Sequence, residues 1–167
     1  ITILEQDKTF EDYFYTKKVR GKRIGEIYGF PSVLHSWCNT RLKVNLINEY
    51  LKKKGKYISY IGIAADEPKR LKRLKENECS MLEKWNMTEQ DCLKFLKRRN
   101  LENPLYENHK RLGCWFCPKQ RIETLKILKN EYPKLWEKLL QWQKDSPFPF
   151  RMETTIYDLG RRFTNEK

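Results

Sequence analysis

Two cysteines stand close together in the stretch RLGCWFCPKQ, residues 111–120. A Cys-x-x-Cys pair can hold a metal ion or an iron–sulfur cluster, shuttle a disulfide, or simply form a turn. Thioredoxin-like redox pairs begin a helix after a strand, whereas the turn-rich ENHKRLG precedes this pair. We therefore favour metal or cluster binding by Cys114 and Cys117, with Gly113 permitting a tight approach and Pro118 ending the turn.

The pair supplies two of the four ligands that zinc or a cubane cluster generally takes. Candidates for the others are Cys38, Cys79, Cys92 and His109. Cys38 stands in HSWCNTRLK at the predicted start of a helix, where the helix dipole, Arg41 and Lys43 would lower its pKa and favour the thiolate. Such a thiolate is a metal ligand or a catalytic nucleophile, although a lone cysteine beside tryptophan is otherwise a small buried hydrophobic residue. Cys79 and Cys92 lie in segments predicted to be helical, so we expect them in the core.

A second polar cluster follows an apolar run in GIAADEPKRLKR, residues 62–73. Asp66, Glu67 and Arg70 would lie at the carboxyl end of a strand, where open α/β sheets bind ligands. The alternative is a charged helix start with acidic residues in its first turn. Upstream, Arg20, Lys22 and Arg23 in a glycine-rich loop either line a phosphate site or face solvent.

Composition limits the partners of these residues. The 167 residues are 39% hydrophobic and 13% aromatic, enough for a folded core, and the formal charge of +13 favours polyanionic partners such as nucleic acid or nucleotides. No apolar run approaches the roughly 20 residues of a membrane span, and no signal peptide opens the chain. Five unevenly spaced cysteines fit a reducing cytoplasm.

The elements that position these residues follow from hydrophobic periodicity. Residues 1–6 predict a short strand, Thr9 caps a helix bearing Phe10 and Phe14, and residues 38–54 predict a helix capped by Asn39 or Thr40. The nearly continuous apolar run over residues 57–64 predicts a central strand buried on both faces of a parallel sheet.

The chain after Pro68 is predicted to be mostly helical. Thr88 and Asp91 form a capping pair, and Leu135, Leu139 and Trp142 form the buried stripe of a helix that Pro133 begins. The predicted fold is α/β, with residues 1–66 as a residual nucleotide-binding portion and residues 67–167 as a helical portion of one compact domain.

Five motifs follow one another along the chain: YGFP, WCNTRLK, YIGIAADEPKR, NPLYE and GCWFCP. The spaced pattern L…P.LW comes after them. Together, over about residues 10–145, they resemble the phosphoadenosine phosphosulfate (PAPS) reductase-like branch of the adenine nucleotide α-hydrolase superfamily, especially its phage and gut-bacterial members. DNA phosphorothioation sulfurtransferases and tRNA thiolation enzymes are similar but more distant.

The resemblance implies a partial doubly wound α/β sheet that binds an adenine nucleotide, ATP or PAPS, at the carboxyl ends of its strands. The residues bordering the nucleotide would be Arg41, Lys43, Asp66, Glu67 and Arg70. Several sulfur-transferring relatives hold an iron–sulfur cluster on three cysteines, which implies Cys38, Cys114 and Cys117 here, with one iron open for sulfur. A closed zinc site would need His109 or another cysteine as the fourth ligand.

The chain also departs from the family pattern. The strand and Ser-Gly-Gly-Lys-Asp-Ser loop that open the family are absent from the sequence, as is the C-terminal catalytic cysteine of the reductases proper, and Ala64 or Ala65 stands where members commonly carry Arg. Two functions follow as expectations. One is adenine-nucleotide-dependent sulfur chemistry, as an oxidoreductase or sulfurtransferase, on an acceptor such as DNA or tRNA. The other is a catalytically incomplete basic protein that binds nucleic acid or a host protein.

Overall fold

A computed structural model describes residues 1–32, 36–107 and 112–166. The chain forms two compact units: residues 1–50 together with residues 113–167 form the first, and residues 51–112 form the second. The first unit thus joins the two ends of the chain, and the predicted boundary between residues 66 and 67 falls inside the second unit. Among the helices of the described residues, none is both long and apolar enough to cross a membrane.

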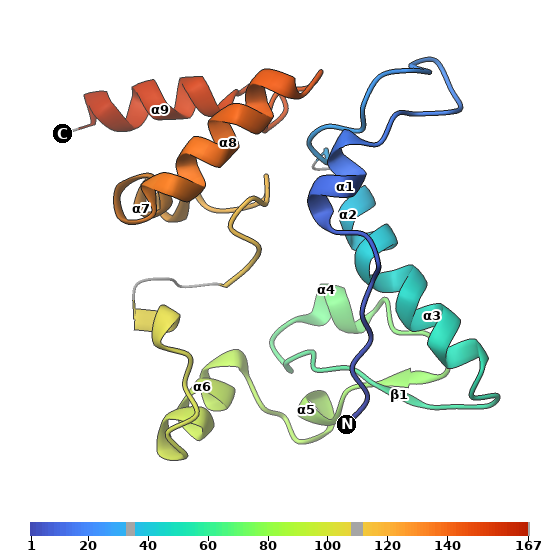
Figure 1. The fold of residues 1–167 in the computed structure, drawn as a ribbon. Coiled ribbons are helices and arrows are strands. Elements are labelled where there is room, and N and C mark those ends of the chain that lie inside the picture. The colour runs from blue at the N-terminus through green and yellow to red at the C-terminus, as the bar shows by residue number, and fades with distance from the viewer. Residues whose placement is uncertain (33–35, 108–111, 167) are drawn as a thin grey trace. The chain divides into compact units, whose positions relative to one another are not determined.

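The first unit is helical. Its N-terminal part contains α1 (Phe10–Tyr15), α2 (Trp37–Asn39) and the π-helical segment η1 (Thr40–Val44), which continues into α3 (Asn45–Lys52) across the boundary with the second unit. Its C-terminal part contains α7 (Ile122–Glu131), α8 (Pro133–Asp145) and α9 (Ile156–Asn165). Helix α8 packs against both α7 and α9 (Figure 1).

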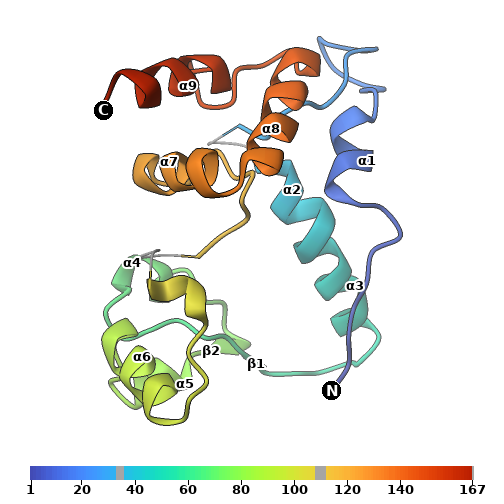
Figure 2. The same ribbon diagram turned by 60° about the vertical axis from the view of Figure 1, so that its left-hand side comes forward.

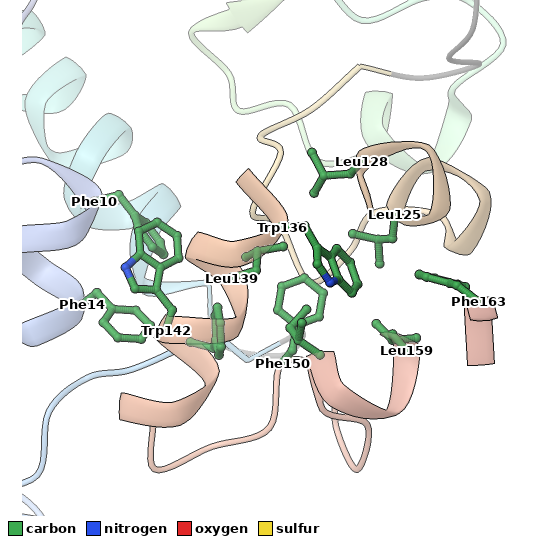
Figure 3. Close-up of a cluster of buried hydrophobic side chains, with 12 residues drawn as sticks. Phe10, Phe14, Leu125, Leu128, Trp136, Leu139, Trp142, Phe150, Leu159 and Phe163 are labelled. Atoms are coloured by element: carbon green, nitrogen blue, oxygen red, sulfur yellow. The ribbon is translucent and has the colours of Figure 1, made fainter. Parts of the chain in front are cut away.

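Aromatic side chains from both parts of the first unit form its core. Trp142 of α8 stacks on Phe14 of α1 with ring centroids 5.5 Å apart, and Phe10 lies 5.2 Å from the same indole (Figure 3). Leu139 and Trp142 are buried, as the stripe predicted for α8 requires, and Trp136 is buried beside Phe163. This burial of large aromatic surface is what holds the two ends of the chain together.

The second unit is mixed α/β. Strands β1 (Ser59–Tyr60) and β2 (Glu78–Cys79) pair in parallel (Figure 2), and α4 (Pro68–Leu71) lies between them in sequence. The remaining helices are α5 (Met81–Lys84), α6 (Glu89–Arg98) and the 3₁₀ turn η2 (Pro104–Glu107). Mixed α/β structure and the mostly helical chain after Pro68 confirm those two predictions.

The long buried strand predicted over residues 57–64 is wrong. Only two residues are extended in a ladder, and Ile58 and Tyr60 are about two-thirds exposed, whereas Ile63 and Ala64 are buried after the strand ends. Continuous apolar sequence indicates burial on two faces only when neighbouring strands cover both, and within the described residues β1 pairs with β2 alone. The strand predicted at residues 1–6 is also wrong, because that segment pairs with no strand among the described residues and Ile1 and Ile3 are exposed.

The helix predicted over residues 38–54 exists but begins earlier. It starts at Trp37, after Ser36, which makes no capping hydrogen bond from its side chain, so the predicted cap at Asn39 or Thr40 is wrong. The Asn45 N–H donates to the Thr40 carbonyl, which widens the helix into a π turn. The helix ends at Lys52, shortly before Gly55, which has a φ of 77°.

Candidate functional site

The structure places Cys38, Cys114 and Cys117 in the same unit, although 76 positions separate the first two in sequence. Cys38 lies in α2 and packs against the aromatic core, whereas Cys114 and Cys117 lie in the turn that precedes α7. Phe10 joins the two segments, because its ring lies 5.1 Å from Trp37 and 4.1 Å from Phe116, between centroids. These two neighbours of Phe10 are each adjacent in sequence to one of the cysteines, Trp37 to Cys38 and Phe116 to Cys117.

The Cys-x-x-Cys segment is a tight hydrogen-bonded turn. The Cys117 N–H donates to the Cys114 carbonyl at 2.9 Å, and the Gln120 side-chain amide donates to the same carbonyl at 3.0 Å. The inner residues Trp115 and Phe116 anchor the turn, since Trp115 stacks on Trp142 with centroids 5.4 Å apart. A Cβ at Gly113 would meet its nearest neighbour, Gln120 Nε2, at an ordinary 3.5 Å, so the turn itself does not require glycine there.

The three thiols are close enough to interact electrostatically. Burial raises the pKa of Cys38, the Asn39 N–H opposes that by hydrogen bonding to the sulfur, and charge on Cys117 and Cys114 raises the pKa further. The expected lowering of the Cys38 pKa is therefore wrong. Desolvation is the largest influence on the pKa of this thiol, and it outweighs the help of the backbone donors.

Arg41 and Lys43 do not supply charge to Cys38. The Arg41 guanidinium donates to the Tyr28 hydroxyl at 2.6 Å and lies over the Tyr28 and Tyr13 rings, at 4.7 and 5.4 Å from their centroids. Lys43 is exposed within η1. The cation expected beside the thiol is thus engaged with aromatic rings instead.

Thiols are the ligands that zinc and iron–sulfur clusters prefer, so the donor chemistry of these cysteines fits such a group. A bound cation would also remove the mutual repulsion of the thiolates that contributes to the raised pKa of Cys38. Across the described ranges, however, no three His, Cys, Asp or Glu side chains are already arranged to hold a metal ion. His109, the candidate fourth ligand, lies outside the described residues.

The remaining cysteines belong to the second unit. Cys79 lies in strand β2, which corrects the helix expected there, and Cys92 lies in α6. Both are half-buried instead of fully within a core. Burial raises the pKa of Cys92, and Asp91 and Asp66 raise it further.

Asp66, Glu67 and Arg70 also lie in the second unit, where each has a local structural partner. Asp66 accepts a hydrogen bond from the Glu89 N–H at 3.1 Å, at the first turn of α6. Glu67 accepts from the Ala64 N–H at 3.3 Å and forms an ion pair with Arg70 at 2.7 Å. These contacts agree with the alternative of a charged helix start, and Arg41 and Lys43 belong to the first unit.

Sequence reasoning missed a pocket of about 440 Å³ in the first unit. Its lining is mainly aromatic: Tyr28, Phe30, Trp37, Phe148 and Phe150, with Lys18, Ser32, Pro149 and Met152. The signal available in the sequence was a pair of similar Phe-Pro turns, YGFPS and SPFPF. The structure brings them together: the Ser146 hydroxyl accepts a hydrogen bond from the Phe30 N–H at 3.2 Å, across 116 positions. Volumes of roughly 300–1,000 Å³ are typical of ligand sites.

Comparisons with known proteins give two relatives. Over 143 residues the chain is 26% identical to "Uncharacterized protein MJ0066" of Methanocaldococcus jannaschii, a match that covers 72% of this chain and 28% of the relative. Over 102 residues it is 33% identical to "Uncharacterized nin region protein ORF290" of Escherichia phage lambda, covering 59% of this chain and 34% of the relative. The chain therefore spans about a third or less of the length of these relatives. No family model and no solved structure matches it.

Proposed function

We propose that this chain is part of a PAPS reductase-like protein that carries out adenine-nucleotide-dependent sulfur chemistry, with nucleic acid as the acceptor. In this proposal Cys38, Cys114 and Cys117 hold an iron–sulfur cluster or zinc, and Cys38 is the candidate nucleophile when no metal is bound. In this proposal the parallel strands β1 and β2 are the remnant of a doubly wound sheet.

The observation that carries the proposal is the approach of Cys38 to the Cys-x-x-Cys turn. Cys38 packs against the aromatic core, Trp115 and Phe116 of the turn pack against the same core, and charge on Cys117 and Cys114 affects the ionisation of Cys38. A metal-binding role would explain why a third thiol lies near the turn, whereas a purely structural role would not. A cluster held there by three thiolates would leave one iron open to bind sulfur.

The adenine nucleotide has weaker support. Arg41 is the proposed contact in the first unit and already lies against Tyr28 and Tyr13, while Asp66, Glu67 and Arg70 are engaged in local contacts of the second unit. ATP or PAPS binding is therefore a prediction that also requires a phosphate-binding loop. The similarity to a phage lambda protein supports the expected phage connection.

Anaerobic purification tests the metal site. We expect iron with acid-labile sulfide, or zinc, in the intact chain, and loss of most of it in Cys38→Ser and in Cys114→Ser. Cys92→Ser is the matched control, because Cys92 is a half-buried thiol in the other unit, and it should keep the metal. If the intact protein holds neither iron nor zinc and Cys114 alkylates freely, the motif is only a turn.

A specific observation favours the alternative of a basic binding protein. Lys69, Lys72, Arg73 and Lys75 are exposed in and after α4, whereas Arg70 is paired with Glu67. Exposed cations of this density bind polyanions without sequence preference. Salt-dependent nucleic-acid binding by a chain that carries no metal would favour this function over sulfur chemistry.

A further inference from the structure

The aromatic pocket of the first unit has a buried floor and open walls. Phe30 and Phe150 form the floor, with ring centroids 5.1 Å apart at an interplanar angle of 84°, and both are almost completely buried. Tyr28, Trp37 and Phe148 line the walls and are half-buried. Flat apolar surfaces of this kind accept a flat aromatic guest.

Cations lie directly over these walls. Lys18 Nζ is 4.5 Å from the centroid of the Phe148 ring, and Arg23 Cζ is also 4.5 Å from that centroid. Arg41 Cζ lies 4.7 Å from the Tyr28 centroid. A guest in the pocket would thus lie beside rings that already have cations over them, at both Phe148 and Tyr28.

The charges continue along a hairpin that leads away from the pocket. Residues 17 and 27 form an antiparallel bridge, and the Lys18 N–H donates to the Glu26 carbonyl at 2.8 Å, which closes the loop between them. Arg20, Lys22 and Arg23 are exposed on this loop. The basic hairpin, residues 17–27, therefore offers several cations in a row beside one aromatic pocket.

We infer that this pocket takes one unstacked base of a single-stranded nucleic acid, whose phosphates follow the basic hairpin. Aromatic walls stack with the π-face of any base, and neighbouring cations neutralise the backbone on either side. A duplex keeps its bases paired and stacked, so it cannot fill the pocket without base extrusion. A free mononucleotide would leave most cations of the hairpin unused. The inference rests on the proposed function only in naming nucleic acid as the acceptor.

Phe148 is suited to a test because its backbone holds the local structure. Its carbonyl accepts from Gln143 Nε2 at 3.0 Å and its N–H donates to the Ser146 hydroxyl at 3.2 Å, and neither bond needs the ring. We expect Phe148→Ala to weaken binding of a labelled 12-nucleotide single strand by about 5- to 100-fold, the range for one base stack. Duplex affinity should stay within about twofold, since the ring contacts only an unstacked base. Tyr132→Ala, a partly exposed aromatic of the same unit outside the pocket, is the control.

The hairpin has its own variant, which keeps the test open should Phe148→Ala fold poorly. Replacing Arg20, Lys22 and Arg23 by Gln should lower the slope of log affinity against log salt by about 2 for a single strand. The control with the same change in charge replaces three exposed lysines of the first unit, Lys119, Lys134 and Lys144. It should leave the slope nearly unchanged.

Several outcomes would overturn the inference: unchanged single-strand binding in Phe148→Ala, equal loss for strand and duplex, or binding of AMP without binding of the strand. The same titration on Cys38→Ser separates this inference from the proposed function. Strand binding that persists in Cys38→Ser leaves the pocket assignment standing, whereas strand binding by an intact protein that carries neither iron nor zinc also removes the proposed metal site. A metal-loaded protein that binds no strand would overturn the pocket assignment and leave the metal site standing.

Discussion

The rings of Phe10 and Phe116 lie with their centroids 4.1 Å apart, and this contact joins helix α1 to the Cys-x-x-Cys turn. Phe10 also stacks on Trp37, the residue before Cys38, at an interplanar angle of 17°. The relative position of the three cysteines therefore depends on an aromatic side chain that has no chemistry of its own. The same ring also packs on Trp142, which links the turn to helix α8.

We predict that Phe10→Ala lowers the free energy of unfolding by about 3–5 kcal/mol, as is usual for a buried phenylalanine. Urea denaturation followed by tryptophan fluorescence measures this loss. Alkylation of Cys38 in the native state should become faster, because the ring that packs on the neighbouring Trp37 is gone. Phe95→Ala, on a partly exposed ring of α6, should cost much less. Unchanged alkylation of Cys38 in Phe10→Ala would show that the ring does not position the thiol.

The raised pKa of Cys38 predicts a pH dependence of stability in the metal-free protein. The folded state holds the thiol proton more tightly than the unfolded state, so this contribution is present below the ordinary thiol pKa of about 8.5 and is lost as pH rises through the folded pKa. Thermal unfolding between pH 7 and 11 should show the loss, and Cys38→Ser should remove that part of it. In the double variant Cys114→Ser and Cys117→Ser, alkylation of Cys38 should shift to lower pH, because the nearby charges are absent.

Gly29 has a φ of 62°, and a Cβ there would lie 2.5 Å from Ser146 Oγ and 2.9 Å from Pro147 Cδ. We predict that Gly29→Ala costs about 2 kcal/mol or more, from left-handed strain together with overlap. Gly25 has a φ of 87° but open space around it, so Gly25→Ala reports the strain alone and should cost less. Equal losses in the two variants, measured by urea denaturation, would mean that the turn at Ser146 moves freely.

Thr88 and Asp91 form a reciprocal cap at the start of α6. The Thr88 hydroxyl accepts from the Asp91 N–H at 3.1 Å, and the Asp91 carboxylate accepts from the Thr88 N–H at 3.1 Å. We expect Thr88→Ala to cost about 1 kcal/mol in stability, and Thr88→Ser to cost less. Hydrogen bonds from Thr88 lower the pKa of Asp91, so the cap weakens as pH falls through that pKa, and thermal unfolding of Thr88→Ala should be less acid-sensitive.

The basic segment of residues 69–75 predicts salt-sensitive binding of a DNA or tRNA duplex with little sequence preference. Replacing Lys69, Lys72, Arg73 and Lys75 by Gln should lower the slope of log affinity against log salt by about 3–4 for duplex DNA. The hairpin variant at Arg20, Lys22 and Arg23 serves as the comparison in the other unit. Affinity that does not change between low and high salt would contradict this prediction.

The amino-acid sequence by itself determined the local features of this protein. Patterns within a few residues predicted the capping residues Thr9 and Thr88 and the helical character after Pro68. The same kind of pattern predicted the burial of Phe10, Phe14 and Trp142. The Cys-x-x-Cys turn was evident for the same reason, and so was the basic charge of the 20–23 loop.

Only the tertiary structure decided which residues distant in sequence are neighbours in the folded protein. Burial of β1 depends on neighbouring strands, which an apolar run does not reveal, and the pKa of Cys38 depends on desolvation that exceeds the effect of its backbone donors. The aromatic pocket combines Tyr28 and Trp37 with Phe148, and charge on Cys114 and Cys117 acts on the distant Cys38. Pairs separated by 70 residues or more leave no periodic signal, because their contact is set by packing of the whole core and not by the local backbone.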